Sequence, residues 1–79
     1  MTAKRRNIKV DPNLLSRFHQ DGESRFLAAL AQPHPDDRLL AMSEASGFLA
    51  GIAAAYLACG DKETFEAIYA WMQARREEK

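Results

Sequence analysis

Apolar residues recur at helical spacing along three stretches of the chain, separated by short segments rich in proline, glycine and aspartate. In the first stretch they form a single stripe when each residue is turned by about 100°, as in an α-helix. The members of this stripe are Leu15, Phe18, Gly22, Phe26, Ala29 and Leu30. Asp11 and Pro12 mark its start, because aspartate accepts a free backbone N–H and proline tolerates the first helical position. The pattern predicts a helix over residues 12–32.

Gly22 leaves an alternative open within this helix, because an Asp-Gly pair also marks breaks and hairpin turns. The flanking residues do not alternate as strands would, which argues against a hairpin. A glycine in the apolar stripe lets a second helix approach closely, although it costs roughly 0.5–1 kcal/mol relative to alanine. We therefore favour one continuous helix over two short ones that break at Gly22.

The second stretch follows a proline-rich link and is apolar nearly all the way round. The prolines stop the first helix, and Asp36 and Asp37 suit the positive end of the next helix dipole. This helix should run over residues 35–59, with Gly60 as its C-terminal glycine. Its larger apolar side consists of Met42, Phe48, Leu49, Ile52 and Tyr56. Its small-residue strip consists of Ser43, Gly47, Gly51, Ala54 and Ala58.

The third stretch begins directly after the second. Gly60 and Asp61 combine a helix-ending glycine with a helix-capping aspartate, and so short a link predicts an antiparallel helix hairpin. The helix should cover residues 62–77. Its core stripe consists of Phe65, Ile68, Tyr69 and Met72, and a second apolar strip consists of Ala67, Ala70, Trp71 and Ala74. No stretch alternates as a strand, so we predict an all-α, three-helix domain.

A helix that is apolar all round needs burial all round, as a core helix or as a membrane span. Glu44 would lie inside the bilayer, and no aromatic belt or strong positive flank brackets the segment, so we favour a core helix and no membrane. Two companion helices cover roughly two-thirds of its circumference. We therefore expect a buried central helix that a second copy completes in a twofold homodimer. Glu44 should face a solvent gap or meet an arginine such as Arg17 or Arg25.

The length and composition of the chain also favour association with a partner. A chain of 79 residues supplies about 3–5 kcal/mol of stability from a single core, and its one cysteine forms no internal disulfide. No apolar secretory segment follows the basic start, so the sequence is typical of a cytoplasmic protein. Cys59 is then expected to be a reduced, buried thiol.

The net charge of zero conceals an asymmetry. A basic arm at the start consists of Lys4, Arg5, Arg6 and Lys9, so the remaining residues carry seven basic and eleven acidic side chains, a net charge of −4. We expect a flexible basic arm over residues 1–10 and a single helical domain over 11–79. Nucleic acid is a less favoured partner, because no predicted helix is basic enough to serve as a recognition helix.

The residue patterns offer little chemistry. Phosphate loops, dinucleotide-binding glycine patterns, paired metal-binding cysteines and nucleophile elbows are all lacking. We interpret His19 as a packed or capping residue and His34 as part of a loop. Asp36 and Asp37 are explained by a helix N-terminus better than by a cation. We therefore expect no enzymatic activity, no cofactor and no metal site.

Two surfaces exceed what a small monomer needs. The small-residue strip of the second helix lets helix backbones come close, either within the chain or across a dimer. Trp71 among Ala67, Ala70 and Ala74 has the composition of a partner-binding anchor, with packing over the core edge as the alternative.

One stretch resembles the helix hairpin of a tetratricopeptide repeat. The positions that match its spacing are Leu49, Ile52, Ala53, Tyr56, Gly60, Phe65 and Tyr69. They cover about a quarter of the chain, Phe65 stands where the repeat has alanine, and a solenoid needs about three copies. The resemblance implies at most a peptide-binding or protein-binding surface.

We expect a non-enzymatic helical interaction module that binds another protein stoichiometrically, as an inhibitor or adaptor of a larger complex. This style is typical of accessory proteins of phages and mobile elements, such as anti-CRISPR inhibitors, by analogy of size and composition alone. The alternative is a small dimeric DNA-binding regulator that uses the basic arm of Lys4, Arg5, Arg6 and Lys9.

Overall fold

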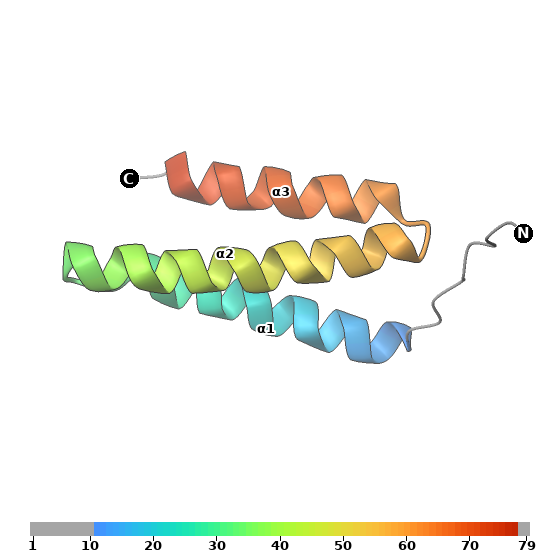
Figure 1. Ribbon diagram of the computed structural model, residues 1–79, viewed down its shortest axis with the longest axis horizontal. Helices are drawn as coiled ribbons and strands as arrows, with labels where there is room; N and C mark the ends of the chain where they lie inside the picture. Colours follow the sequence, from blue (N-terminus) through green and yellow to red (C-terminus); the bar gives the residue numbers. More distant parts are fainter. Residues whose placement is uncertain (1–10, 78–79) are drawn as a thin grey trace, which may run out of the picture.

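The chain folds into three helices that lie side by side, with the second in the middle (Figure 1). The computed structural model describes residues 11–77. Helix α1 spans Pro12–Leu30, α2 spans Pro35–Ala58 and α3 spans Lys62–Glu77, and no strand occurs in this range. The predicted all-α fold and the antiparallel hairpin of α2 and α3 are confirmed.

The helix ends follow the residues that the sequence places there. The side chain of Asp11 accepts a 3.0 Å hydrogen bond from the backbone N–H of Asn13, and Pro12 opens α1. Gly60 follows the C-cap of α2, and its φ of +89° suits a residue without a Cβ. The N–H of Gly60 bonds to Leu57 and that of Asp61 to Tyr56, which is the Schellman pattern.

Two helices end slightly earlier than predicted. Helix α1 stops at Leu30 rather than residue 32, because Pro33 disfavours the helical conformation in the residue before it. The N–H of Ala31 already bonds to Ala28 as well as Leu27, the tightened last turn of an ending helix. Helix α2 stops at Ala58, with Cys59 as its C-cap.

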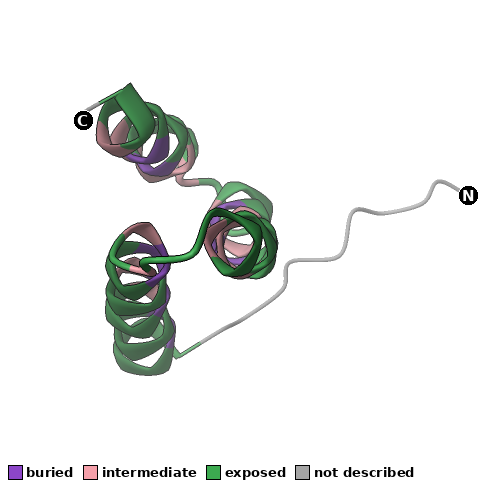
Figure 2. Ribbon diagram, turned by 90° about the vertical axis from the view of Figure 1, so that its left-hand side faces the viewer, coloured by how far each residue is buried: buried purple, intermediate pink, exposed green. Residues whose placement is uncertain are grey.

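The core lies where the three helices face one another. Each helix contributes one fully buried large side chain, Phe26 from α1, Leu49 from α2 and Ile68 from α3. Figure 2 looks along the bundle and shows the buried positions of α1 and α3 turned toward α2. The complete buried set is Leu15, Phe26, Ala29, Ala45, Leu49, Ile52, Ala53, Ile68 and Met72.

Gly22 is the point of closest approach between α1 and α2. Helix α1 runs through it without a break, as predicted, and Gly22 is buried. A Cβ added there would lie 2.6 Å from Cδ2 of Leu49 and 3.0 Å from Cδ2 of Phe48. The missing side chain of Gly22 therefore makes room for Leu49, which explains why a glycine occupies the apolar stripe.

Three expectations about burial need correction. Phe18 and Tyr69 belong to the predicted stripes but are 45% and 44% exposed, because each lies at the rim of its stripe. Cys59 was expected to be buried and is exposed. It is the C-cap residue of α2, where the chain turns away toward α3.

Candidate interaction surfaces

Helices α1 and α3 cover only part of the circumference of α2. Its buried residues are Ala45, Leu49, Ile52 and Ala53, and they face α1 and α3. Its outer side is exposed over most of its length, and Figure 2, which looks along the helix, shows this side facing away from α1 and α3. At about 100° per residue, the uncovered arc is roughly a third of the circumference. This agrees with the expectation that two companion helices cover roughly two-thirds of α2, because α1 and α3 pack on neighbouring parts of its surface and leave the remainder open.

The small-residue strip lies on this uncovered arc. Ser43, Gly47, Gly51, Ala54 and Ala58 are all exposed. A Cβ added at Gly47 or Gly51 would meet nothing within 4 Å. Neither α1 nor α3 therefore packs closely against Gly47 or Gly51 within the chain.

Leu40 and Glu44 flank the strip on the same open arc. Leu40 is 63% exposed, and helical spacing places it in line with Gly47 and Ala58. Glu44 is also exposed, which agrees with the solvent gap that its charge predicts. Arg25 does not pair with it, because its Nε lies 2.9 Å from Asp21 Oδ2.

Trp71 lies at the edge of the core. Its ring meets Phe26 of α1 edge to face, with 5.4 Å between the centroids, and is only partly exposed. The guanidinium of Arg75 stacks 5.0 Å from the ring centre. Ala67, Ala70 and Ala74, the other members of the predicted partner-binding set, are exposed. Trp71 thus occupies the core-edge position that the alternative reading predicts.

A groove opens where the first turns of α2 pass the end of α3. Its volume is about 1090 Å³, and its apolar lining comes from Leu30, Leu39 and Met42. Leu39 is 73% exposed, the most of any large apolar side chain in residues 11–77. The remaining lining residues are Pro35, Asp36, Arg38, Ser43, Ser46, Arg75 and Arg76.

Sequence reasoning missed this groove, although helix lengths carry its signal. Helix α2 has 24 residues and α3 has 16. In an antiparallel hairpin joined by a short turn, the shorter helix leaves roughly the first two turns of the longer one uncovered. Leu39 lies in these turns, and the arginines at the end of α3 fall beside them.

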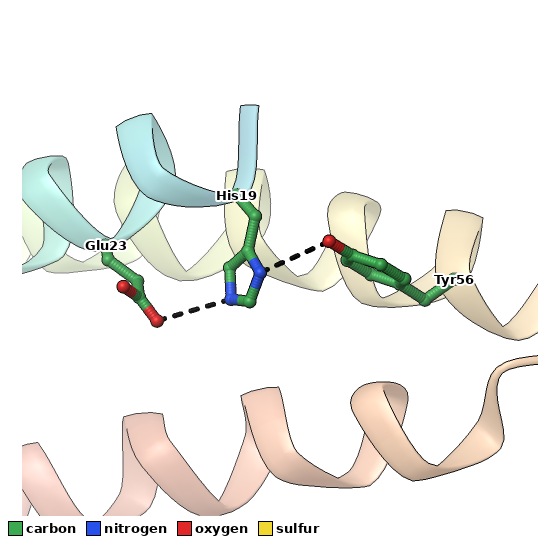
Figure 3. A network of polar contacts seen from close by, with 3 residues as sticks. All are labelled: His19, Glu23 and Tyr56. Carbon is green, nitrogen blue, oxygen red and sulfur yellow. Dashed lines mark hydrogen bonds and ion pairs between the residues drawn. The ribbon is translucent and has the colours of Figure 1, made fainter. Parts of the chain in front are cut away.

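A polar network ties α1 to α2 at the opposite end of the bundle (Figure 3). The hydroxyl of Tyr56 lies 3.4 Å from Nδ1 of His19, and Nε2 of His19 lies 3.2 Å from Oε2 of Glu23. The His19 and Tyr56 rings also meet edge to face. Burial, reinforced by the charges of Asp61 and Glu23, raises the pKa of Tyr56 above its usual value. The packed role expected for His19 is confirmed.

Other candidate chemistry stays sparse along residues 11–77. His34 is the residue before α2 and lies in the link, as expected. Asp36 and Asp37 occupy the first turn of α2. No cluster of three or more metal-ligating side chains occurs in this part of the chain. The basic arm of Lys4, Arg5, Arg6 and Lys9 lies outside the described residues.

Helix α2 also has the length and composition of a membrane span. Among the described residues it is the one helix that meets this test, and 22% of its most apolar window is buried within the chain. The core helix of a soluble protein, which is mostly buried, and a signal sequence near an N-terminus meet the same test.

Comparison with protein families, with curated proteins and with solved structures gives no match to this chain. Its function is therefore inferred from its own surfaces.

Proposed function

We propose that this chain is a non-enzymatic interaction module that forms a homodimer and binds a further protein stoichiometrically. The uncovered side of α2 carries the proposal. A helix that is apolar nearly all the way round is stabilised by burial on every side. Helices α1 and α3 leave roughly a third of the circumference of α2 open to solvent. A small domain that exposes such a face gains stability by association.

The residues on the open arc favour a second copy of the same helix. Gly47 and Gly51 present bare backbone, so a second helix can approach closely and gain dispersion contacts along its length. Leu40 supplies a larger side chain beside them. In a twofold arrangement each copy offers the same strip, so Leu40 of one copy packs beside the glycines of the other.

Oligomeric state tests this proposal directly. We expect light scattering at micromolar concentration to give twice the 8.9 kDa mass of one chain. Replacement of both glycines in a Gly47→Leu/Gly51→Leu variant should yield a folded monomer. The added side chains point into open space in the single chain but block the close approach of a second helix.

Leu57→Ser serves as the matched control, because Leu57 is exposed on α2 beside the arc rather than in the strip. It should leave the dimer intact. A wild-type chain that is strictly monomeric contradicts the proposal, as does a double-leucine variant that still dimerises. Flotation with lipid vesicles tests the other possible partner of the open side of α2, a lipid bilayer. A chain that floats with the vesicles covers α2 with lipid rather than with a second copy.

The biological setting is part of the same proposal. We place the module in the cytoplasm as an inhibitor or adaptor of a larger complex, and accessory proteins of phages and mobile elements offer an analogy of size and style. Affinity capture with the wild-type chain, compared with the double-leucine variant, tests whether dimerisation is needed for partner binding.

A further inference from the structure

We infer that the groove between the start of α2 and the end of α3 binds an acidic amphipathic helix of the partner protein. The inference rests on the proposed function, since it describes the second surface of a protein-binding module. It assigns that surface to a groove that shares only Ser43 with the dimer strip.

The apolar part of the groove is left open by the fold. Helix α3 ends before it reaches the first turns of α2, and Leu39 stays 73% exposed there. Leu30 and Met42, which pack on the core, form the apolar floor beside it. A helix with a row of leucines covers such a floor and removes Leu39 from water.

The charged part of the groove is predominantly positive. Among the described residues, the guanidiniums of Arg38, Arg75 and Arg76 line it together with the carboxylate of Asp36. This local excess stands out because residues 10–79 carry a net charge of −4. Complementary charge therefore favours an acidic ligand.

The arginines are held in place by contacts within the chain. Nη1 of Arg38 donates a 2.8 Å hydrogen bond to the carbonyl of Gln32, and Nη2 of Arg76 donates to Oγ of Ser46 at 3.2 Å. Arg75 stacks on Trp71. A guanidinium has five N–H donors, so one such bond positions the group without exhausting it. Side chains ordered in advance lose less entropy on binding a carboxylate.

Other occupants satisfy only part of this lining. The basic arm carries the same charge as the arginines, since it includes Lys4, Arg5, Arg6 and Lys9. Nucleic acid phosphates would meet the arginines but leave Leu39 and the apolar floor uncovered. An acidic amphipathic helix matches both parts.

Synthetic peptides test the match between charge and apolar surface. The probe is a helical peptide with leucines at i, i+3, i+4 and i+7 and glutamates beside them. Two matched peptides replace either the glutamates by glutamine or the leucines by serine. We expect the acidic leucine peptide to bind on the order of tenfold more tightly than either, and its affinity to fall as salt rises.

Variants of the chain locate the binding site. Arg75→Gln/Arg76→Gln should weaken binding of the acidic peptide by about tenfold, whereas Arg17→Gln/Lys62→Gln removes equal charge elsewhere and should not. Leu39→Ser should weaken binding, and Leu57→Ser should leave it unchanged. Asp36→Asn removes the carboxylate of the groove and should tighten binding, a gain that a poorly folded variant does not produce.

Three results would overturn the inference. They are equal binding of the glutamate and glutamine peptides, full affinity in the Arg75→Gln/Arg76→Gln variant, and tighter binding of a DNA duplex with no need for Leu39. The oligomeric state of the same samples separates this failure from failure of the proposed function. A dimer that ignores the acidic peptide overturns the groove assignment alone, whereas a strict monomer overturns the dimeric module.

Discussion

Gly22 and Gly47 occupy opposite surroundings in one bundle, and alanine at each should act in opposite directions. At Gly22 the new methyl would lie 2.6 Å from Cδ2 of Leu49, which is fully buried. We expect Gly22→Ala to lower the free energy of unfolding by about 1–2 kcal/mol, since overpacking outweighs the gain in helix propensity. At Gly47 no atom lies within 4 Å of the new methyl, and Gly47→Ala should raise the free energy of unfolding by about 0.5–1 kcal/mol.

Urea unfolding measures both changes, at a concentration where light scattering shows a single chain. Equal stabilisation by the two alanines would mean that α1 and α2 do not meet closely at Gly22.

Residue patterns in the sequence predict well which face of a helix is buried, but they predict poorly which side chains contact one another. The apolar stripe places Gly22 between packed helices, and the structure confirms it. The exposure of Cys59 escapes prediction, because it depends on where the chain leaves α2 rather than on the residue itself. Arg25 shows the same limit: Asp21 and the Phe48 ring, 4.7 Å from its guanidinium, take the place suggested for Glu44.

At the scale of the helix, α3 depends on the cap that Asp61 supplies. Oδ1 of Asp61 accepts from the backbone N–H of Thr64 at 2.9 Å, and Oδ2 accepts from the Thr64 hydroxyl at 2.7 Å. The hydrogen bond from the Thr64 hydroxyl has the larger effect and the one from the Thr64 backbone the smaller, and together they lower the pKa of Asp61 below its usual value. A carboxyl with a lowered pKa stabilises the fold above its unfolded pKa, and this stabilisation is lost as pH falls through the folded pKa.

We therefore expect Asp61→Ala to lower the thermal midpoint at neutral pH, by an amount that shrinks as the solution is acidified. Asp61→Asn keeps a capping side chain without a titrating group, so it should retain most of the stability and lose the acid dependence. Circular dichroism melts across the acidic range measure both. A neutral-pH midpoint that Asp61→Ala leaves unchanged would contradict the capping role, and Glu63→Gln in the same turn controls for charge.

The lengths of the helices could be predicted from the sequence, but the lining of the groove between α2 and α3 could not. Gly60 and the prolines of the link set the helix bounds to within two residues. The groove follows from the difference between 24 and 16 residues, yet Arg75 and Arg76 reach it only through the rotation of α3 against α2. Side-chain packing at the core determines that rotation, and the pattern of apolar residues in the sequence does not predict the rotation.

In the whole molecule, Trp71 of α3 contacts α1 directly. Its edge-to-face contact with Phe26 joins α3 to α1. We expect Trp71→Ala to lower the free energy of unfolding by about 2–3 kcal/mol, less than for a fully buried tryptophan because the ring is partly exposed. Urea unfolding followed by circular dichroism measures the loss.

Trp71→Phe should recover much of that loss, and Ala74→Ser, at an exposed position of the same strip, should change little. Unchanged stability in Trp71→Ala would return Trp71 to the partner-binding role that its alanine neighbours suggest.

The central position of α2 also has a kinetic consequence. The main contacts of the fold join helices that follow one another in the chain, α1 with α2 and α2 with α3. Closing either pair needs only a short loop, so little chain entropy is lost before apolar contacts form. Such a topology folds rapidly, and either hairpin can nucleate first on α2, with the third helix docking afterwards. We therefore expect the middle helix to be the surface on which both neighbours assemble during folding.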